Sequence, residues 1–370
     1  MKTYDTVIVG GGIIGGAIAF ELARAGQRVV LIDRQQAGME ASWAAAGMLA
    51  PGAETADSVA VAPLGKLSLD LYPQWIAQVE AASGMDTEFE QKPGLQIFFG
   101  EGAARECAEF IRLQRGLGLP TEEISLAEAH AIEPALSAEA RAVARVEREA
   151  RLDTRKLLAA VFRAAAQAGV ELREREAVKG VRVERSHCEG VTTSAGEVRA
   201  KNTVICAGSF ASQLADVARY APTEPVRGQM AALPPATPVV RYVLRSHCGY
   251  IVPREDGRLI CGSTAERVGY EKRVTPEGIE KILASARELA PALADAPVVE
   301  TWCGLRPDTP DHLPCIGPTD VAGLFIAAGH YRNGVLLTPI TVKTVREFVL
   351  EGRTTLPEAR KYSPMRFSRN

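Results

Sequence analysis

The sequence predicts an α/β fold whose main sheet is parallel and is assembled from distant parts of the chain. Three short apolar runs indicate this, at residues 6–10 (TVIVG), 203–208 (TVICAG) and 323–329 (GLFIAAG), and each run ends at a glycine. Apolar runs without polar alternation are typical of strands buried on both faces, as in a parallel sheet. We therefore expect the three runs to pair in one sheet.

The first run opens a strand–helix–strand unit. Apolar and small side chains recur at helical spacing over residues 13–24, and Gly26 stands where a helix C-terminal glycine would. Residues 28–33 (RVVLID) then form a second buried strand. The unit is about 30 residues long, which is the usual size of a parallel crossover.

The rest of the chain contains further predicted elements. Residues 155–169 predict an amphipathic helix, and residues 170–185 alternate polar and apolar side chains as strands do. Residues 247–263 hold the turn signal Asp256-Gly257 between two strand-like runs, which predicts a hairpin. Residues 222–238 are rich in proline, and we expect them to cross between two domains.

Charge and composition exclude several classes of partner. The 370-residue chain has 43 Lys and Arg against 45 Asp and Glu, a formal net charge of −2, so nothing favours a nucleic-acid partner. No stretch has the uninterrupted apolar length of a membrane span, and the N-terminal residues run into a strand without a signal peptide. We expect a cytoplasmic protein that binds neither nucleic acid nor membrane.

The seven cysteines form no CxxC pair and predict reduced thiols. Cys303, His312 and Cys315 lie close together in the sequence, which raises the question of a metal site. They lack a fourth ligand at zinc-like spacing, so we expect no metal.

A GxGxxG motif lies between the first strand and the first helix. It consists of Gly10, Gly12 and Gly15, and Asp33 ends the next strand. In this motif the first glycine permits the tight turn, the second lets the backbone approach a pyrophosphate, and the third lets helix and strand pack closely. The helix N-terminus attracts the phosphates, and Asp33 can accept hydrogen bonds from a ribose. This context favours dinucleotide binding over a glycine-rich turn without a ligand.

The motif alone does not separate a nicotinamide from a flavin. Residues 40–51 (EASWAAAGMLAP) place a series of small side chains after the second strand. Small side chains let backbone N–H groups come close to a cofactor, although a loop packed tightly against the sheet would have the same composition. We interpret the stretch as a flavin contact.

Four stretches together resemble the FAD-dependent D-amino-acid oxidase family, and most closely its glycine-oxidase-like members, which serve thiamine biosynthesis. They are residues 7–26 (VIVGGGIIGGAIAFELARAG), 42–51 (SWAAAGMLAP), 302–318 (WCGLRPDTPDHLPCIGP) and 327–339 (AAGHYRNGVLLTP). The similarity runs from residue 5 to about residue 350, and it is least distinctive in the middle of the chain.

The resemblance implies two domains. One is a Rossmann-like FAD-binding domain made from separated segments, which we place at residues 1–80, 145–220 and 300–370. The other is a substrate domain with a large mixed or antiparallel sheet, which we place at residues 81–144 and 221–299. The resemblance also implies a homo-oligomer.

The family's FAD contacts can be carried over residue by residue. The adenosine and pyrophosphate positions, in addition to the motif glycines, are Ile13, Ile14, Asp33, Arg34, Ala41 and Ser42. The positions beside the flavin ring are Ala46, Gly47 and Met48. Val178 falls on the adenine side, and Ala207 and Gly208 end a strand at the cofactor. The pyrimidine end of the ring and the ribityl chain are expected at His330, Tyr331, Arg332, Asn333, Gly334, Val335 and Leu336.

Two residues near these positions depart from the family pattern. Some members attach FAD covalently through a cysteine in the segment that contains Cys303, but Cys303 is offset, beside Gly304. We therefore expect non-covalent FAD. Trp43 places a large ring beside the small-residue run, and we assign it no role from the sequence.

The resemblance also implies substrate-binding residues. Arg306, in GLRPDTP, is the candidate for holding a substrate carboxylate, because a planar guanidinium matches a carboxylate with two hydrogen bonds. Tyr250 can donate its hydroxyl to the same carboxylate, and Arg332 is expected near the flavin and the substrate. The alternatives are surface salt bridges for the arginines and core packing for Tyr250.

The implied reaction is oxidative deamination of glycine or a similar small amino acid or amine. Molecular oxygen is reduced to hydrogen peroxide, and the imine is hydrolysed to a keto acid, glyoxylate for glycine, and ammonia. Rival readings are a flavin dehydrogenase that reduces a quinone, an oxidase for D-amino acids, sarcosine or another amine, a nicotinamide-dependent dehydrogenase, and a non-catalytic FAD-binding protein. The sequence contains no Ser-His-Asp arrangement, GxSxG elbow or HExxH motif that would indicate a hydrolase.

Overall fold

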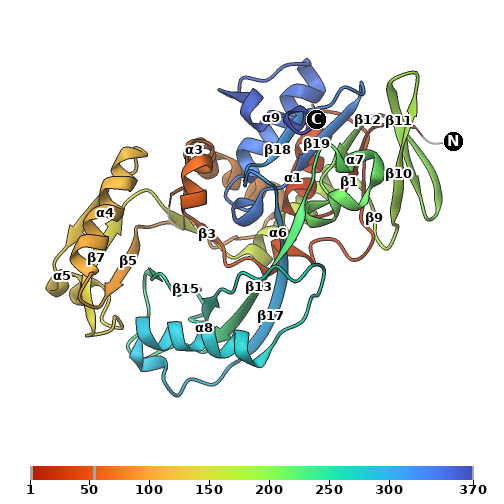
Figure 1. The fold of residues 1–370 in the computed structure, drawn as a ribbon. Helices are drawn as coiled ribbons and strands as arrows, with labels where there is room; N and C mark the ends of the chain where they lie inside the picture. Colours follow the sequence, from red (N-terminus) through yellow and green to blue (C-terminus); the bar gives the residue numbers. More distant parts are fainter. Residues whose placement is uncertain (1–2, 53–55, 369–370) are drawn as a thin grey trace.

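The computed structural model describes residues 3–52 and 56–368, which fold around two large sheets (Figure 1). The first sheet has the strand order β10-β11-β12-β1-β2-β9, and β12 also pairs with β19, which pairs with β18. Its strands are β1 (Thr3–Val9), β2 (Val29–Ile32), β9 (Glu171–Arg173), β10 (Val178–Glu184), β11 (His187–Thr193), β12 (Gly196–Ile205), β18 (Cys315–Pro318) and β19 (Leu324–Ala328).

The parallel part of this sheet joins strands that are far apart in the sequence. β1 runs parallel to β12, with Val9 opposite Ile205, and β12 runs parallel to β19, with Ile205 opposite Ile326. The three glycine-terminated runs therefore form one sheet, as the sequence predicts. Because parallel strands end at the same edge, the residues that follow them meet at the edge where α/β proteins bind their ligands.

Helices cover one face of the first sheet. The helices α1 (Ile13–Arg24) and α9 (Thr338–Glu351) contact its strands, and α3 (Ala56–Ser83) and α6 (Thr154–Gln167) pack against these helices. Ile8 and Leu31 of the strands join Ile18 of α1 and Val161 of α6 in one buried cluster. The predicted helix after the glycine motif is confirmed, and Gly26 follows it with a φ of +86°, a backbone conformation that favours glycine.

The second sheet is mixed and has the order β17-β13-β16-β15-β14-β5-β7-β6. Its neighbouring strands are antiparallel except for β5 and β14, which are parallel. Its strands are β5 (Gly94–Phe99), β6 (Thr121–Ile124), β7 (Ala140–Val146), β13 (Glu224–Leu233), β14 (Val243–Arg245), β15 (Tyr250–Pro253), β16 (Leu259–Gly262) and β17 (Glu300–Asp308). The expected large mixed sheet is thus present beside the Rossmann-like one.

Helix α8 (Pro276–Leu289) packs on one face of the second sheet, where Ile282 and Leu289 join its core (Figure 1). The other face turns toward the first sheet. Helices α4 (Ala103–Gly116) and α5 (Leu126–Ile132) lie at the β5–β7 end. A small sheet of β3 (Met48–Leu49), β8 (Ala150–Arg151) and β4 (Glu90–Gln91) also forms.

Two local predictions for the second sheet have different outcomes. The predicted hairpin is present, since β15 and β16 pair on either side of Asp256-Gly257. The segment expected to cross between two domains, residues 222–238, is mostly strand, because β13 occupies Glu224–Leu233 and lies between β17 and β16. The prolines flank the strand or lie at its start, which leaves the apolar stretch from Gly228 to Leu233 free to pair.

Among the described residues, no helix is long and apolar enough to cross a membrane.

Candidate functional site

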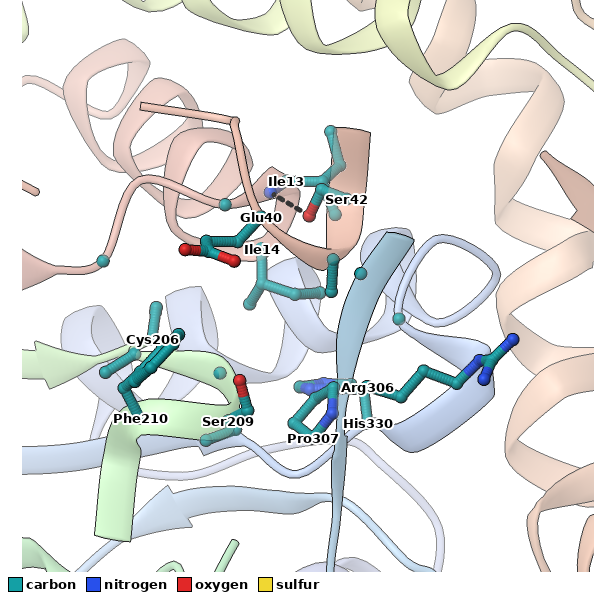
Figure 2. Close-up of a pocket in the computed structure, with 18 of the residues that line it drawn as sticks. Ile13, Ile14, Glu40, Ser42, Cys206, Ser209, Phe210, Arg306, Pro307 and His330 are labelled. Atoms are coloured by element: carbon teal, nitrogen blue, oxygen red, sulfur yellow. Dashed lines mark hydrogen bonds between the residues drawn. The ribbon is translucent and has the colours of Figure 1, made fainter. Parts of the chain in front are cut away.

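A cavity of about 550 Å³ lies between the first sheet and the second sheet. Its walls come from both ends of the chain, since the glycine turn at Gly10 and Gly12 and the segment from His330 to Val335 both line it. Figure 2 shows Ile13 and Ile14 at the start of α1 on one side, and Arg306, Pro307 and His330 on another. The two ends of the chain therefore build one site.

The glycine turn has no room for side chains. Gly10 has a φ of +106°, and a Cβ atom there would lie 2.4 Å from the carbonyl oxygen of Cys206 at the end of β12. A Cβ atom at Gly15 would lie 2.0 Å from the carbonyl oxygen of Gly10. Gly10 therefore permits the turn, and Gly15 permits close contact of helix and strand, as the motif predicts. Gly15 itself does not line the cavity.

The start of α1 is fixed by a neighbouring loop. The backbone N–H of Ile13 donates a hydrogen bond to the Ser42 hydroxyl oxygen over 3.0 Å (Figure 2). Ser42, Ala41 and Glu40 line the cavity beside the helix N-terminus. The positive end of the α1 helix dipole therefore faces this cavity, and this arrangement is suited to a phosphate group.

Asp33 is held at the end of β2 by two backbone amides. Its Oδ2 accepts a hydrogen bond from Gly11 N over 2.7 Å, and its Oδ1 accepts one from Gln35 N over 2.9 Å. Burial raises the pKa of the Asp33 carboxyl, and the two amides and the nearby Arg34 oppose that rise. Asp33 lines the cavity, and its carboxylate oxygens can each accept a further hydrogen bond, as a ribose would supply.

A segment beyond β16 reaches across to the first sheet. The Tyr270 ring stacks on Phe210 with centroids 5.0 Å apart, and its hydroxyl donates to the carbonyl oxygen of Ser209 over 2.8 Å. The Arg34 guanidinium lies 3.4 Å from the centroid of the same Phe210 ring. Lys272 forms an ion pair with Glu40 over 2.9 Å. These contacts tie the walls of the cavity together at the Asp33 end.

The small-residue loop after β2 forms another wall. Residues 44–48 all line the cavity. Gly47 has a φ of +81°, and a Cβ atom there would lie 2.0 Å from the carbonyl oxygen of Leu152. A small residue is therefore required at Gly47 by its close contact with Leu152. The small side chains of the loop also leave the cavity on its other side open.

The second sheet brings the expected substrate groups into the same cavity. Arg306 Nη2 donates to the Ser263 hydroxyl oxygen over 2.7 Å, and Nη1 donates to the carbonyl oxygen of Thr264 over 3.0 Å. A Cβ atom at Gly228 would lie 2.3 Å from Nη1, so the guanidinium occupies space that only a glycine leaves. The Tyr250 hydroxyl lies 3.6 Å from the Met230 sulfur.

The segment after β19 contributes a neutral imidazole. His330 is buried, and its Nε2 lies 3.0 Å from the Thr341 hydroxyl of α9. Burial lowers the pKa of His330 to about 3, so the ring is uncharged at neutral pH. Tyr331, Arg332, Gly334 and Val335 also line the cavity.

The structure brings nearly all sequence-predicted site residues together. The predicted residues that line the cavity are Gly10, Gly12, Ile13, Ile14, Asp33, Arg34, Ala41, Ser42, Ala46, Gly47, Met48, Val178, Ala207, Gly208, Tyr250, Arg306, His330, Tyr331, Arg332, Gly334 and Val335. Leu336 and Asn333 were expected there and do not line it. Leu336 points into the core, because the α9 side of the segment is buried against the helices of the first sheet.

Sequence reasoning missed several cavity residues. Among them are Glu40, Lys179, Ser209, Phe210, Gly228, Met230 and Ser263. Phe210 lies two residues after Gly208, the glycine that ends a predicted strand, and that position is a signal which could have identified it. The residues of β13 carry no such signal, because only the pairing of the second sheet brings them over the cavity.

Cys303 and Trp43 lie outside the cavity lining. Gly304 and Arg306 of β17 line the cavity. Because successive side chains of a strand point to opposite faces, Cys303 points away from the cavity. Trp43 packs edge to face on Trp302 with centroids 6.1 Å apart, and the Arg155 guanidinium lies 3.6 Å from the Trp43 ring centroid. Trp43 therefore has a packing role.

In the part of the chain that the structure describes, no group of three or more His, Cys, Asp or Glu side chains could hold a metal ion. His312 Nδ1 lies 2.7 Å from Asp308 Oδ1.

The turn, the helix N-terminus, the carboxylate at the end of β2 and a cavity of about 550 Å³ together fit a dinucleotide. The fold and the site thus define a dinucleotide-dependent oxidoreductase. The chain belongs to the FAD-dependent oxidoreductase family known as DAO, whose family model matches residues 5–347. FAD is accordingly its cofactor.

Individual relatives are similar over nearly the whole chain. The chain is 35% identical to a glycine oxidase of Geobacillus kaustophilus over 350 residues, covering 94% of this chain and 93% of that protein. A crystal structure of glycine oxidase from Geobacillus kaustophilus matches with a TM-score of 0.93 and 32% identity over the full length of both chains.

A relative of another kind is longer. The chain is 36% identical to a bifunctional protein ThiO/ThiG of Trichormus variabilis over 357 residues. That alignment covers 95% of this chain and 53% of the relative, so the chain spans about half the length of such relatives.

Proposed function

We propose that this protein catalyses the oxidative deamination of glycine, with oxygen as the electron acceptor. The observation that carries the proposal is the position of Arg306, whose guanidinium lies in the same cavity as the glycine turn and the small-residue loop. The glycine oxidase relative supports the same substrate.

We infer the FAD contacts from the residues that line the cavity. We propose that the pyrophosphate lies at Gly12 and Ile13, and that Asp33 binds the ribose of the adenosine. The flavin ring would lie beside Ala46 and Gly47, with the segment from His330 to Val335 along its other end. Cys303 points away from this cavity, which supports non-covalent binding.

The protein's own groups would orient the substrate. The Arg306 guanidinium is fixed by Ser263 and the carbonyl oxygen of Thr264, and its position allows it to bind the glycine carboxylate. Tyr250 would donate its hydroxyl to the same carboxylate, and Arg332 adds positive charge nearby. With the carboxylate anchored, the Cα–H bond is held in one orientation, which is the main catalytic contribution of such a site.

A bound FAD would supply the two-electron acceptor for the hydride equivalent that leaves Cα while the amine loses a proton, and oxygen would take up the two electrons to give hydrogen peroxide. The glycine imine is then hydrolysed to glyoxylate and ammonia. His330, which burial keeps neutral, adds no charge to the cavity near neutral pH.

An oxygen-electrode assay of the flavin-loaded protein tests this function. We expect oxygen consumption that depends on glycine, with hydrogen peroxide, glyoxylate and ammonia formed in equal amounts. Reduction of a quinone or a dye by glycine without oxygen consumption would instead identify a dehydrogenase. Turnover of sarcosine or a D-amino acid with no turnover of glycine would contradict the proposed substrate.

We also propose that the chain forms two domains, one that binds FAD and one that binds the substrate. Residues 1–80, 145–220 and 309–370 would form the FAD domain, and residues 81–144 and 221–308 the substrate domain. The boundary expected at residue 300 moves to residue 308 because β17 pairs with β13. A cytoplasmic location and a homo-oligomeric assembly complete the proposal.

A further inference from the structure

Four consecutive carbonyl groups of the small-residue loop are held from behind by donors that do not line the cavity. The loop comprises residues 44–47, and its donors come from three different parts of the chain. The Trp302 indole N–H donates to Ala44 O over 3.0 Å, and the Thr154 hydroxyl donates to Ala45 O over 2.8 Å.

The next two carbonyls are held in the same way. Arg254 Nη2 donates to Ala46 O over 2.7 Å, and the backbone N–H of Leu152 donates to Gly47 O over 3.0 Å. Arg254 is itself fixed, because its Nε lies 3.3 Å from Asp153 Oδ2. Asp153 also caps α6 by accepting from two backbone amides of that helix. The donors are therefore anchored in buried structure rather than in mobile side chains.

The direction of the carbonyls decides the direction of the amides. In a trans peptide unit the C=O and N–H bonds point in opposite directions. Carbonyls that point back to Thr154 and Arg254 therefore send the N–H groups of Ala46 and Gly47 away from those donors, on the side where the loop lines the cavity. Within the described chain, no protein acceptor contacts the N–H of Ala46 or Gly47.

We propose that Thr154 and Arg254 are positioning residues for the bound flavin, which hold the loop carbonyls back and present the amides of Ala46 and Gly47 to the cofactor. This inference rests on the proposed function only in placing the flavin ring beside the loop. Amide dipoles fixed in advance stabilise the negative charge that a flavin gains on reduction, and they need no reorganisation when it is reduced. The two residues would thus act on FAD without touching it.

Thr154→Val tests the proposal because valine keeps the shape of threonine and removes only the hydroxyl. Ala45 O is then left buried without its donor, which frees the peptide unit to rotate. We expect FAD affinity to fall about 2- to 12-fold, as for the loss of one neutral hydrogen bond. We also expect a lower flavin midpoint potential and shifted visible absorbance bands.

Three further variants separate positioning from general packing. Thr154→Ser restores the hydroxyl, and we expect it to restore the midpoint potential and the absorbance bands. Thr344→Val is the matched control, because the buried Thr344 hydroxyl donates to Ile340 O within α9, away from the loop. We expect wild-type flavin properties for Thr344→Val. Arg254→Lys keeps a charge beside Asp153 without the planar fork, and we expect it to shift the potential in the same direction as Thr154→Val.

FAD titration of the apoprotein and dye-equilibrated reduction of the holoprotein measure these quantities without any substrate. Unchanged affinity, potential and spectrum in Thr154→Val would overturn the inference, and so would an equal shift in Thr344→Val. A wild-type protein that binds FAD but is not reduced by glycine would contradict the proposed function alone. The flavin measurements on the variants would still decide whether the loop is positioned as we propose.

Discussion

In the proposed function, substrate binding depends most directly on Arg306. Arg306→Lys keeps the positive charge but loses the planar pair of donors, and a lysine cannot reach Ser263, Thr264 O and a carboxylate together. We expect kcat/KM for glycine to fall about 10- to 150-fold, which corresponds to roughly 1.5–3 kcal/mol for a charged hydrogen bond. Steady-state kinetics of the holoenzyme would measure the change.

Two controls accompany this substitution. Arg112→Lys changes an exposed arginine of α4 and should leave kcat/KM unchanged. For a simple amine without a carboxylate, Arg306→Lys should lower kcat/KM much less than it does for glycine. An Arg306→Lys enzyme with wild-type kcat/KM for glycine would contradict the assigned role.

His330 predicts a pH dependence of stability. Burial lowers its pKa in the folded protein to about 3, whereas an unfolded histidine has a pKa of about 6.5. Between these values the unfolded chain binds a proton that the folded chain does not. The free energy of unfolding therefore falls as the pH is lowered from about 6.5, by up to about 1.4 kcal/mol per pH unit from this group.

His330→Gln removes this contribution and should make the decline with falling pH shallower. Urea unfolding of the wild type and the variant at pH 7, 6 and 5 would measure it. Parallel declines in the two proteins would show that His330 is not the group responsible.

At the scale of elements, the contact between β1 and α1 depends on Gly15. In Gly15→Ala, the new methyl group would lie 2.0 Å from Gly10 O and would push the helix away from the turn. Overpacking of this kind costs about 1–3 kcal/mol, so we expect FAD to bind about 5- to 150-fold more weakly. The FAD content of the purified protein and a titration of the apoprotein would report the loss.

Gly116→Ala is the matched control for this substitution. Gly116 ends α4, and a Cβ atom there would meet nothing within 4 Å. Alanine is favoured over glycine in a helix by about 0.5–1 kcal/mol, so we expect FAD binding to be retained and stability to be equal or slightly higher. Equal FAD binding in Gly15→Ala and the wild type would contradict the close-packing explanation.

The elements that the sequence predicted well are those with a local signal. The strand–helix–strand unit and the hairpin at Asp256-Gly257 each carry turn glycines at fixed offsets from apolar runs. β13 was not predicted as a strand because its flanking prolines dominate the local composition, while its pairing partners, β17 and β16, follow later in the chain. Only tertiary pairing makes that segment a strand.

At the scale of the whole molecule, the site exists because two sheets meet. The first sheet supplies the glycine turn and Asp33 at the ends of its parallel strands, and the second supplies Arg306 and Tyr250. The GxGxxG motif was enough to predict the glycine turn and Asp33, whereas Arg306 and Tyr250 were predicted from the resemblance to the family. The sequence could not identify the contact of Tyr270 with Phe210 or the donors behind the loop, because these pairs are far apart in the chain and neither belongs to a motif.

The most direct test of glycine oxidation is an anaerobic titration of the purified, flavin-loaded protein with glycine, followed by flavin absorbance. We predict that glycine bleaches the flavin rapidly and that oxygen then restores its colour. A yellow protein that stays oxidised with glycine, but bleaches with D-alanine or a larger amine, would keep the FAD site and contradict glycine as the substrate.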